Sequence, residues 1–362
     1  MSEVSKMNQV REAKLDSMLF VGNGSLGSNA LSLFDGFRSV FRECHMIDTS
    51  IYDSPPKISM RNVIRFFFPI FYGFIVSTFL SLQVKFLVRR YHPDVFFVFK
   101  GIYLTRECLD GIDAIKVHYH PDDSSSKENR TNIFDKAESA YDFHFTSKIH
   151  NLSEISKRTG KSVYFIWYAY DERWHFRDPN MELKNRSYLL GFIGHFRPDR
   201  LEMFIDLSQQ LGKKLAIAGK NWTRASHLLR KATIVSPQYG ESFSHFCRKA
   251  PVQLGLLNSA NRDLHTARSF EIPATGALLL AQNTSEHREI FNHMRTALLF
   301  DALEDIYALL DWIEKNPLEA QKIADRGYAL ITSKSNKWRD RANEIFLIIK
   351  KSHKIRNNYP DP

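Results

Sequence analysis

Short apolar runs alternate with longer helical stretches along this chain, and no other feature of the sequence restricts the fold as much. A first series of apolar runs has strand length and lies at 18–21, 95–99, 114–118, 143–146 and 162–167. A second series starts afresh at 188–193 and continues at 214–218, 234, 253–257 and 277–281. Strands that alternate with helices form parallel sheets covered by helices. The pattern therefore predicts an α/β protein with two Rossmann-like, doubly wound domains.

The length of 362 residues suits two domains of ordinary size. We expect an N-terminal domain at 1–180, a second domain at 181–335, and a terminal helix at 336–362 that packs back toward the first domain. Ligands of doubly wound sheets bind beyond the carboxyl ends of the strands. The two domains are therefore expected to face a cleft that collects those ends.

The charge of the chain bears on its partners. It has 50 Lys and Arg against 40 Asp and Glu, a formal net charge of +10. This balance favours anionic partners such as nucleic acid, an acidic membrane face or phosphorylated small molecules. The basic residues are spread along the chain with no Arg-rich arm, zinc finger or RNP motif, so nucleic acid is not an expected partner. The three cysteines stand far apart and the first twenty residues contain no apolar signal segment, which predicts a cytoplasmic protein without a structural metal.

One stretch, residues 261–291, gathers side chains that suit nucleotide binding. Asp263 and His265 stand just before a short predicted helix that carries Arg268 and Glu271 on one face. A carboxylate in this place can accept hydrogen bonds from both ribose hydroxyls, and an arginine can take phosphate charge. The alternative is a surface Arg–Glu pair without function, and the spacing alone favours that alternative.

The same stretch resembles a glycosyltransferase group that includes the CgeB-like spore-maturation proteins and, more distantly, the large GT-B family with an E-x7-E signature. Glu271 precedes an Ala-Thr-Gly turn and an apolar strand, as the second Glu of that signature does, and Asp263 stands in the place of the first. The resemblance implies a GT-B fold with Glu271 on the donor ribose and Asp263 near the donor sugar. It also implies that Arg268 touches phosphate or braces Glu271.

The resemblance extends over most of the second half. Residues 189–204 resemble the strand and basic loop that open the donor domain, which makes Arg197 and Arg200 candidates for diphosphate contact, although each can equally be a solvated charge. Lys220 follows the next strand-glycine turn, and Tyr239 precedes a glycine that faces the nucleotide in this group. The resemblance implies sugar transfer from a nucleotide sugar to a glycan or glycolipid of a cell-surface polymer, without a metal or other cofactor.

The first predicted strand runs into the sequence GNGSLG at 22–27, which matches a dinucleotide-binding turn in its letters. Asp48 is the best candidate for the acidic residue that such a turn requires, so an NAD-dependent oxidoreductase remains an alternative function. In a GT-B protein the same loop, with Gly24 at its centre, would face the donor phosphates or the acceptor. A non-catalytic protein that keeps the GT-B fold and has lost turnover is the second alternative.

The sequence VHYHPDD at 117–123 ends another predicted strand with four polar side chains. His118, His120, Asp122 and Asp123 are therefore candidates for a general base or for sugar binding. The alternative is a loop of metal-like composition that holds no metal. Residues 171–175 are a less favoured contributor to the same cleft.

Residues 66–84 contain no charged side chain, and basic residues flank the run on both sides. Its length permits a spanning helix, but Pro69, Gly73 and several polar residues argue against one. A buried core helix is the first interpretation, and a helix lying in an anionic membrane surface is the second. The second interpretation would place the protein at the inner face of the membrane, close to a lipid-linked acceptor.

Overall fold

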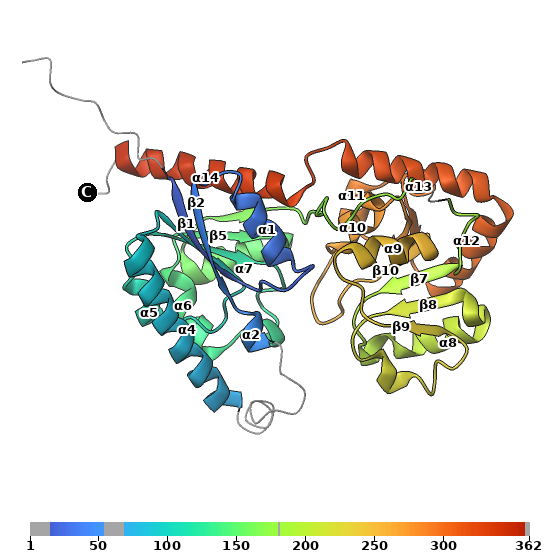
Figure 1. The fold of residues 1–362 in the computed structure, drawn as a ribbon, viewed down its shortest axis with the longest axis horizontal. Helices are drawn as coiled ribbons and strands as arrows, with labels where there is room; N and C mark the ends of the chain where they lie inside the picture. Colours follow the sequence, from blue (N-terminus) through green and yellow to red (C-terminus); the bar gives the residue numbers. More distant parts are fainter. Residues whose placement is uncertain (1–14, 54–68, 180–181, 359–362) are drawn as a thin grey trace, which may run out of the picture. The chain divides into compact units, whose positions relative to one another are not determined.

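The computed structural model describes residues 15–53, 69–179 and 182–358. They form two compact units (Figure 1). Unit 1 contains the described residues up to Ile166 together with those from Arg341 onward, and unit 2 contains Trp167–Asp340. The boundary therefore falls earlier than the predicted one at 180/181. The reason is that the segment after Ile166 bonds within unit 2, where Tyr170 pairs with Lys337 and exchanges backbone hydrogen bonds with Asn336 and Trp338.

Unit 1 is built on a six-stranded parallel sheet in the order β2-β1-β3-β4-β5-β6. Its strands are β1 (Ser17–Gly22), β2 (Glu43–Asp48), β3 (Val95–Phe99), β4 (Ile115–His120), β5 (Phe143–Thr146) and β6 (Val163–Phe165). Its main helices are α1 (Asn29–Phe37), α2 (Ser50–Asp53), α4 (Pro69–Tyr91), α5 (Arg106–Asp110), α6 (Asn132–Ala137) and α7 (Ile149–Thr159).

Alternate residues of these strands build two cores, because successive strand side chains point to opposite faces. Leu19 and Phe96 pack with α4, α5 and α6 on one face. Phe20 and Phe97 stack at 5.1 Å on the other face, beside Phe37 of α1. These buried faces explain why the strands read as continuous apolar runs in the sequence.

Unit 2 has a second six-stranded parallel sheet, in the order β12-β11-β10-β7-β8-β9. Its strands are β7 (Leu190–Ile193), β8 (Leu215–Ala218), β9 (Thr233–Val235), β10 (Val252–Gly255), β11 (Leu278–Gln282) and β12 (Leu298–Phe300). Its helices are α8 (Leu201–Leu211), α9 (Glu241–Lys249), α10 (Arg268–Ala274), α11 (Ser285–Ile290), α12 (Leu303–Lys315) and α13 (Pro317–Thr332). The last helix, α14 (Trp338–Asn358), begins in unit 2 and continues into unit 1.

The predicted fold class, two doubly wound α/β domains, is confirmed. Three details differ from the sequence interpretation. The strand β2, Glu43–Asp48, was not among the predicted runs. The run at 298–300 is a strand that the sequence analysis did not assign, and it extends the second sheet beyond β11. Strand β4 continues two residues past its predicted end at 118, so that His120 belongs to the sheet rather than to the following loop.

Helix α4 contains most of the predicted apolar segment at 66–84, whose residues 66–68 lie outside the described residues. One face of the helix is core, since Val76, Leu80 and Val84 are buried. The other face presents four large apolar side chains that are 60–65% exposed, namely Phe74, Phe79, Leu82 and Phe86. Within the described part of the chain, no helix combines the length and hydropathy that crossing a membrane requires.

Candidate functional site

The strand order of unit 2 locates its binding edge. Counted from its first strand, the order β9-β8-β7-β10-β11-β12 reads 3-2-1-4-5-6, the order of dinucleotide-binding doubly wound sheets. The order reverses between β7 and β10, and ligands of such sheets bind beyond the carboxyl ends of the strands at this point. The loops that follow β7 and β10, residues 194–200 and 256–267, therefore border the expected site.

Two glycines let the backbone close this edge tightly. Gly194 follows β7, and Gly219 follows β8 with a φ of 155°. A Cβ atom at Gly219 would lie only 1.9 Å from the carbonyl oxygen of Gly194. Only glycine fits at this position, so the glycine turns predicted from the sequence have a structural reason here.

Basic side chains surround an exposed histidine, His195, which follows Gly194 directly. Its Nδ1 lies 3.4 Å from the backbone nitrogen of Lys220. Partial burial lowers the pKa of His195, and the positive charges of Lys220, Arg268 and Arg200 lower it further. Three predicted basic residues, which come from three separate segments, thus create a positive potential around one exposed side chain. An anion such as a diphosphate would relieve their mutual repulsion.

The individual basic residues have different partners. Arg200 donates to the backbone carbonyl of Leu257 at 2.7 Å, and its guanidinium lies over the Phe192 ring at 5.6 Å. Burial lowers the pKa of Arg200, while the charges of Asp199 and Asp263 act in the opposite direction. Arg200 therefore joins the loop after β7 to the loop after β10, and Asp263 lies close enough to influence its charge.

Arg197 lies farther out on the same loop. It pairs with Asp199 at 3.1 Å and donates to the Ser259 hydroxyl at 3.3 Å. Lys220 lies over the exposed ring of Tyr239, with its Nζ 5.8 Å from the ring centroid. The loops after β8 and β9 thus contribute one cation and one aromatic face to the edge.

Glu271 is the most buried of the predicted binding residues in unit 2, with 3% of its surface exposed. It lies in the first turn of α10, where a carboxylate is favoured by the helix dipole. Its Oε2 accepts a hydrogen bond from Arg268, whose Nε donates to the carbonyl of Ile193 at the end of β7. Arg268 also lies over the Phe243 ring at 4.9 Å. The Arg268–Glu271 pair is therefore anchored to the switch point, unlike an ordinary surface pair.

A histidine from the start of unit 2 faces the same carboxylate. The Nε2 of His175 lies 3.9 Å from Oε1 of Glu271, and its Nδ1 accepts from the backbone N–H of Asp171 at 3.0 Å. Because Nδ1 accepts, the hydrogen of the neutral ring is on Nε2, toward Glu271. Burial lowers the pKa of His175 although Glu271 acts in the opposite direction. The sequence analysis placed residues 171–175 near the site, but nothing in the sequence pairs His175 with Glu271.

The glycine-rich turn of unit 1 is occupied by the chain itself. The backbone N–H of Gly24 donates to Oδ1 of Asp48 at 2.7 Å, and Asp48 also accepts from the N–H and hydroxyl of Ser50, both at 2.8 Å. These three donors lower the pKa of Asp48 although partial burial raises it. Asp48 thus holds the turn closed, and its oxygens are engaged where an NAD-binding protein would offer them to a ribose. The acidic residue expected for the GNGSLG turn therefore has an intramolecular role in this structure.

The four candidates at 118–123 occupy different environments. His118 is buried, and its Nε2 donates to the carbonyl of Lys100 at 2.9 Å. Asp123 is buried and accepts from the backbone N–H of Ser125. Asp122 keeps 28% of its side chain exposed and pairs with Lys100 at 2.6 Å. Of the four, Asp122 has the most access to a substrate.

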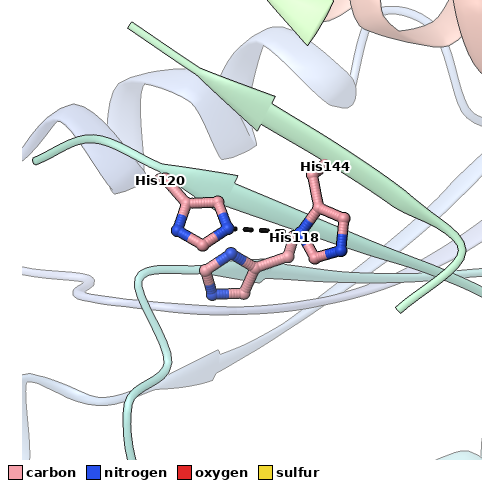
Figure 2. Close-up of side chains that lie close together, drawn as sticks. All are labelled: His118, His120 and His144. Carbon is pink, nitrogen blue, oxygen red and sulfur yellow. Dashed lines mark hydrogen bonds between the residues drawn. The ribbon is translucent and has the colours of Figure 1, made fainter. Parts of the chain in front are cut away.

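His120 completes this set and has a neighbour that the sequence analysis did not find. Its Nε2 lies 3.2 Å from Nδ1 of His144, on the adjacent strand β5. Figure 2 shows these two rings and that of His118 turned toward one another. Burial lowers the pKa of His118 to about 4 and that of His144 to about 3, so both are neutral at neutral pH. Gly24 and these residues belong to unit 1, whereas the other predicted site residues belong to unit 2.

Unit 2 is similar in sequence to a known family. Residues 197–346, which include nearly all of unit 2 after β7, match a family model described as "Glycosyl transferase-like". No curated protein matches the sequence.

Several solved structures share the fold of the whole chain. A sucrose-phosphate synthase from Thermosynechococcus elongatus has 10% identity and a TM-score of 0.66, covering 94% of this chain and 100% of that one. The Anabaena protein HepE in complex with UDP-glucose has 12% identity and a TM-score of 0.64, over 92% and 99% of the two chains. A glycosyltransferase from Rickettsia africae has 10% identity and a TM-score of 0.63, over 93% and 99%. The fold is therefore that of GT-B glycosyltransferases, as the resemblance implied.

Proposed function

We propose that this protein is a glycosyltransferase that takes its donor, a nucleotide sugar, at the carboxyl edge of unit 2. The observation that carries the proposal is the anchored Arg268–Glu271 pair beside an exposed His195 surrounded by cations. A carboxylate fixed at the switch point suits the two hydroxyls of a ribose, and the cations suit the adjacent diphosphate. UDP is the first nucleotide to test, because the HepE structure of the same fold contains UDP-glucose.

Each residue then has a definite role. Glu271 accepts from the ribose hydroxyls, and Arg268 holds it in place. Arg200 and Lys220 face the diphosphate, with Arg197 at the outer side of the loop, and the Tyr239 ring borders the nucleotide. Asp263, which influences the charge of Arg200, lies toward the donor sugar.

Turnover on this scheme uses basic side chains, and not a divalent ion, to stabilise the nucleoside diphosphate as it leaves. Positive groups aimed at the position where charge develops do this without the reorganisation that water requires. Activity should accordingly persist when Mg²⁺ and Mn²⁺ are left out. Loss of activity on chelation that Mg²⁺ or Mn²⁺ restores would contradict this part of the proposal.

The acceptor is a glycan or glycolipid, and unit 1 provides its base. Asp122 combines exposure with a position at the carboxyl edge of the first sheet, next to the end of β4. It takes the proton of the acceptor hydroxyl or binds the sugar, while its pairing with Lys100 keeps it in place.

The exposed face of α4 brings the protein to an anionic membrane surface that carries a lipid-linked acceptor. Phe74, Phe79, Leu82 and Phe86 would enter the boundary between headgroups and acyl chains, and Arg89 and Arg90 in the last turn would meet lipid phosphates.

Flotation with vesicles of phosphatidylglycerol and phosphatidylcholine tests the membrane step. We expect the wild type to float at low salt and the triple variant Phe74→Ser, Phe79→Ser, Phe86→Ser to stay at the bottom with an unchanged fold. A matched control replaces the exposed apolar residues Leu228 and Leu318 of unit 2 by Ser. A wild type that does not float contradicts membrane docking and leaves the donor proposal intact.

A thermal-shift screen with UDP, GDP, ADP, CMP and NAD tests the donor site. A ligand present at a hundred times its dissociation constant adds about 2.7 kcal/mol of stability. We expect stabilisation by one nucleoside diphosphate and none by NAD. Stabilisation by NAD alone would favour the oxidoreductase, and nucleotide binding without consumption of any nucleotide sugar would favour a non-catalytic relative.

A further inference from the structure

Three buried histidines of unit 1 form a compact group, which we call the three-histidine cluster: His118 and His120 on β4, and His144 on β5. One ring nitrogen of each lies within 4.8 Å of one ring nitrogen of both others. The strand register explains the grouping, since His118 pairs directly with His144 and His120 follows two residues later on the same face. In Figure 2 the three rings converge on one point between the two strands.

The surroundings of the cluster are those of a core. The His118 ring lies 5.0 Å from the Phe134 ring and 4.8 Å from the Tyr141 ring, and both aromatic residues belong to the core beneath α6. Apolar residues would be expected at such positions. Three polar rings there destabilise the fold unless their nitrogens have partners, because a buried polar atom without a partner has lost its hydrogen bonds to water.

Within the described residues, some of these nitrogens have no protein partner. His118 must carry its hydrogen on Nε2, because Nε2 donates to the carbonyl of Lys100. Its buried Nδ1 is therefore a bare lone pair, and no described group bonds to it. The buried Nε2 of His144 is likewise without a partner in the described chain. The fold therefore fixes the direction of the Nδ1 lone pair of His118, and this lone pair accepts no hydrogen bond from the described residues.

We propose that His118, His120 and His144 bind a zinc ion, which nothing in the donor chemistry requires. A tetrahedral zinc site has Zn–N distances of about 2.0–2.1 Å, which puts its nitrogens about 3.3 Å apart. Nε2 of His120 and Nδ1 of His144 already lie 3.2 Å apart. When zinc replaces the hydrogen between them, that hydrogen moves to the other nitrogen of the same ring, so that no proton is lost and no electron is transferred.

The remaining features of a zinc site are also present. The carbonyl of Lys100 orients His118 from behind, as outer partners of metal-bound histidines do. A cavity of about 10 Å³ adjoins His118 and His120 and is lined by Asp122, Asp123 and Ser124. This is about the space of one water, which would supply the fourth ligand. Three imidazoles favour zinc over Mg²⁺ or Mn²⁺, which prefer oxygen ligands.

Zinc titration of the untagged, full-length protein tests the site. The protein is first dialysed against a chelator and then titrated with ZnCl₂ in competition with a chromophoric chelator. We expect one zinc per chain with micromolar or tighter affinity. His144→Gln and His118→Gln should each weaken this binding by at least about a hundredfold.

The matched control is His287→Gln, since His287 is also buried, with its pKa lowered to about 4 by burial, but lies in unit 2. This variant should bind zinc like the wild type. Absence of stoichiometric binding to the wild type, or unchanged binding to His144→Gln, would overturn the proposal.

A spectroscopic measurement on the wild type decides the question even if the variants do not fold. Co²⁺ in the three-histidine cluster should show the strong visible absorption of a four-coordinate ion. Only the weak absorption of six-coordinate Co²⁺ would overturn the proposal. Neither measurement depends on sugar transfer, so failure here leaves the donor proposal standing.

Discussion

The carboxyl edges of the two sheets have similar strand-to-loop turns. They differ in how their charged side chains are paired. In unit 1 the glycine turn is closed by Asp48, and Arg130 of the loop after β4 is paired with the buried Glu138, which lies just before β5 and also accepts from Arg158. In unit 2, Lys220 faces an aromatic ring and has no carboxylate partner among the described residues, and His195 is exposed among cations. The edge of unit 1 thus engages Asp48 within its own turn, whereas the edge of unit 2 keeps the exposed His195 among cations.

This contrast has a consequence for mutation. Removing a charge from a self-paired edge leaves a buried partner without compensation, so the loss falls on folding. Removing a charged side chain that contacts mainly a ligand changes the stability of the free protein little. The main loss is then in binding affinity. Variants of the two edges should therefore separate in a plot of stability against nucleotide affinity.

The largest effect is expected for Glu138→Gln in unit 1. Its carboxylate is only 3% exposed in the side chain and pairs with both Arg130 and Arg158. Breaking such a buried pair costs about 3–5 kcal/mol of unfolding free energy. Urea unfolding measures this loss, and UDP affinity should be unchanged. The control Asp135→Asn removes a half-exposed partner of Arg130 and should cost less than about 1 kcal/mol.

The pH dependence of the same residue follows from its pKa. Burial alone would raise the pKa of Glu138, but hydrogen bonds from Arg158 and Arg130 lower it to about 2 from an ordinary value of 4.5. A depressed pKa contributes stability that is fully present above pH 4.5 and is lost as the pH falls toward 2. This contribution is on the order of 3 kcal/mol. If wild type and Glu138→Gln lose stability equally between these pH values, the pairing does not stabilise the edge.

Asp122→Asn tests a partly exposed carboxylate at the carboxyl edge of unit 1. Its ion pair with Lys100 is partly solvated, so stability should fall by less than about 1 kcal/mol. Loss of a general base should lower kcat by about 100-fold or more. Asp110→Asn, which breaks an exposed pair with Arg106 in the same unit, serves as the control and should keep the wild-type kcat. An equal fall in both variants would place the base elsewhere.

Glu271→Gln should lower both nucleotide affinity and stability, because this buried carboxylate also pairs with Arg268 in the free protein. Replacing a charged acceptor of the ribose hydroxyls should weaken UDP binding by about 1–3 kcal/mol. Calorimetry with UDP measures the change, and Glu202→Gln on the exposed side of α8 is the control. Unchanged affinity in a folded Glu271→Gln protein would remove Glu271 from the nucleotide site and weaken the contrast between the two edges.

The smallest effect is expected for Lys220→Met. An exposed cation near a diphosphate contributes about 1 kcal/mol or less, and salt screens that contribution. Affinity for UDP should fall several-fold at low salt, and the difference from wild type should vanish as salt is raised. Lys213→Met, in the exposed turn just before β8, should show no difference at any salt concentration. A loss of UDP affinity that persists at high salt would mean that Lys220 acts through a direct hydrogen bond.

Much of the fold could be predicted from the sequence because the signals are local. Apolar runs of strand length gave both sheets, since strands buried on both faces must be apolar along their whole length. The strand β12 was missed because its apolar residues, Leu298–Phe300, directly precede the helical pattern that starts at Leu303. The strand β2, Glu43–Asp48, was missed because polar residues interrupt it. Strand β4 was ended too early because polar histidines interrupt its apolar run.

Some residues of the candidate site could likewise be predicted from local sequence, and others could not. Glu271 and Arg268 were predicted as a pair because they lie three residues apart on one helix, and that spacing alone places them on one face. The glycine turn at Gly219 could also be predicted from the sequence, because a glycine directly after a strand is typical of a close approach between two backbone segments.

Only the tertiary structure decided which distant residues meet. His175 reaches Glu271 across 96 positions of the chain, Asp48 closes the turn at Gly24, and His144 joins His118 through the register of two neighbouring strands. Local propensity is set by a residue and its immediate neighbours, whereas such contacts depend on strand order and register, which no short segment encodes. For this reason the sequence determined the class of fold and the polar residues available. The tertiary structure determined that Asp48 is engaged by the turn of unit 1, while His195 of unit 2 stays exposed among cations.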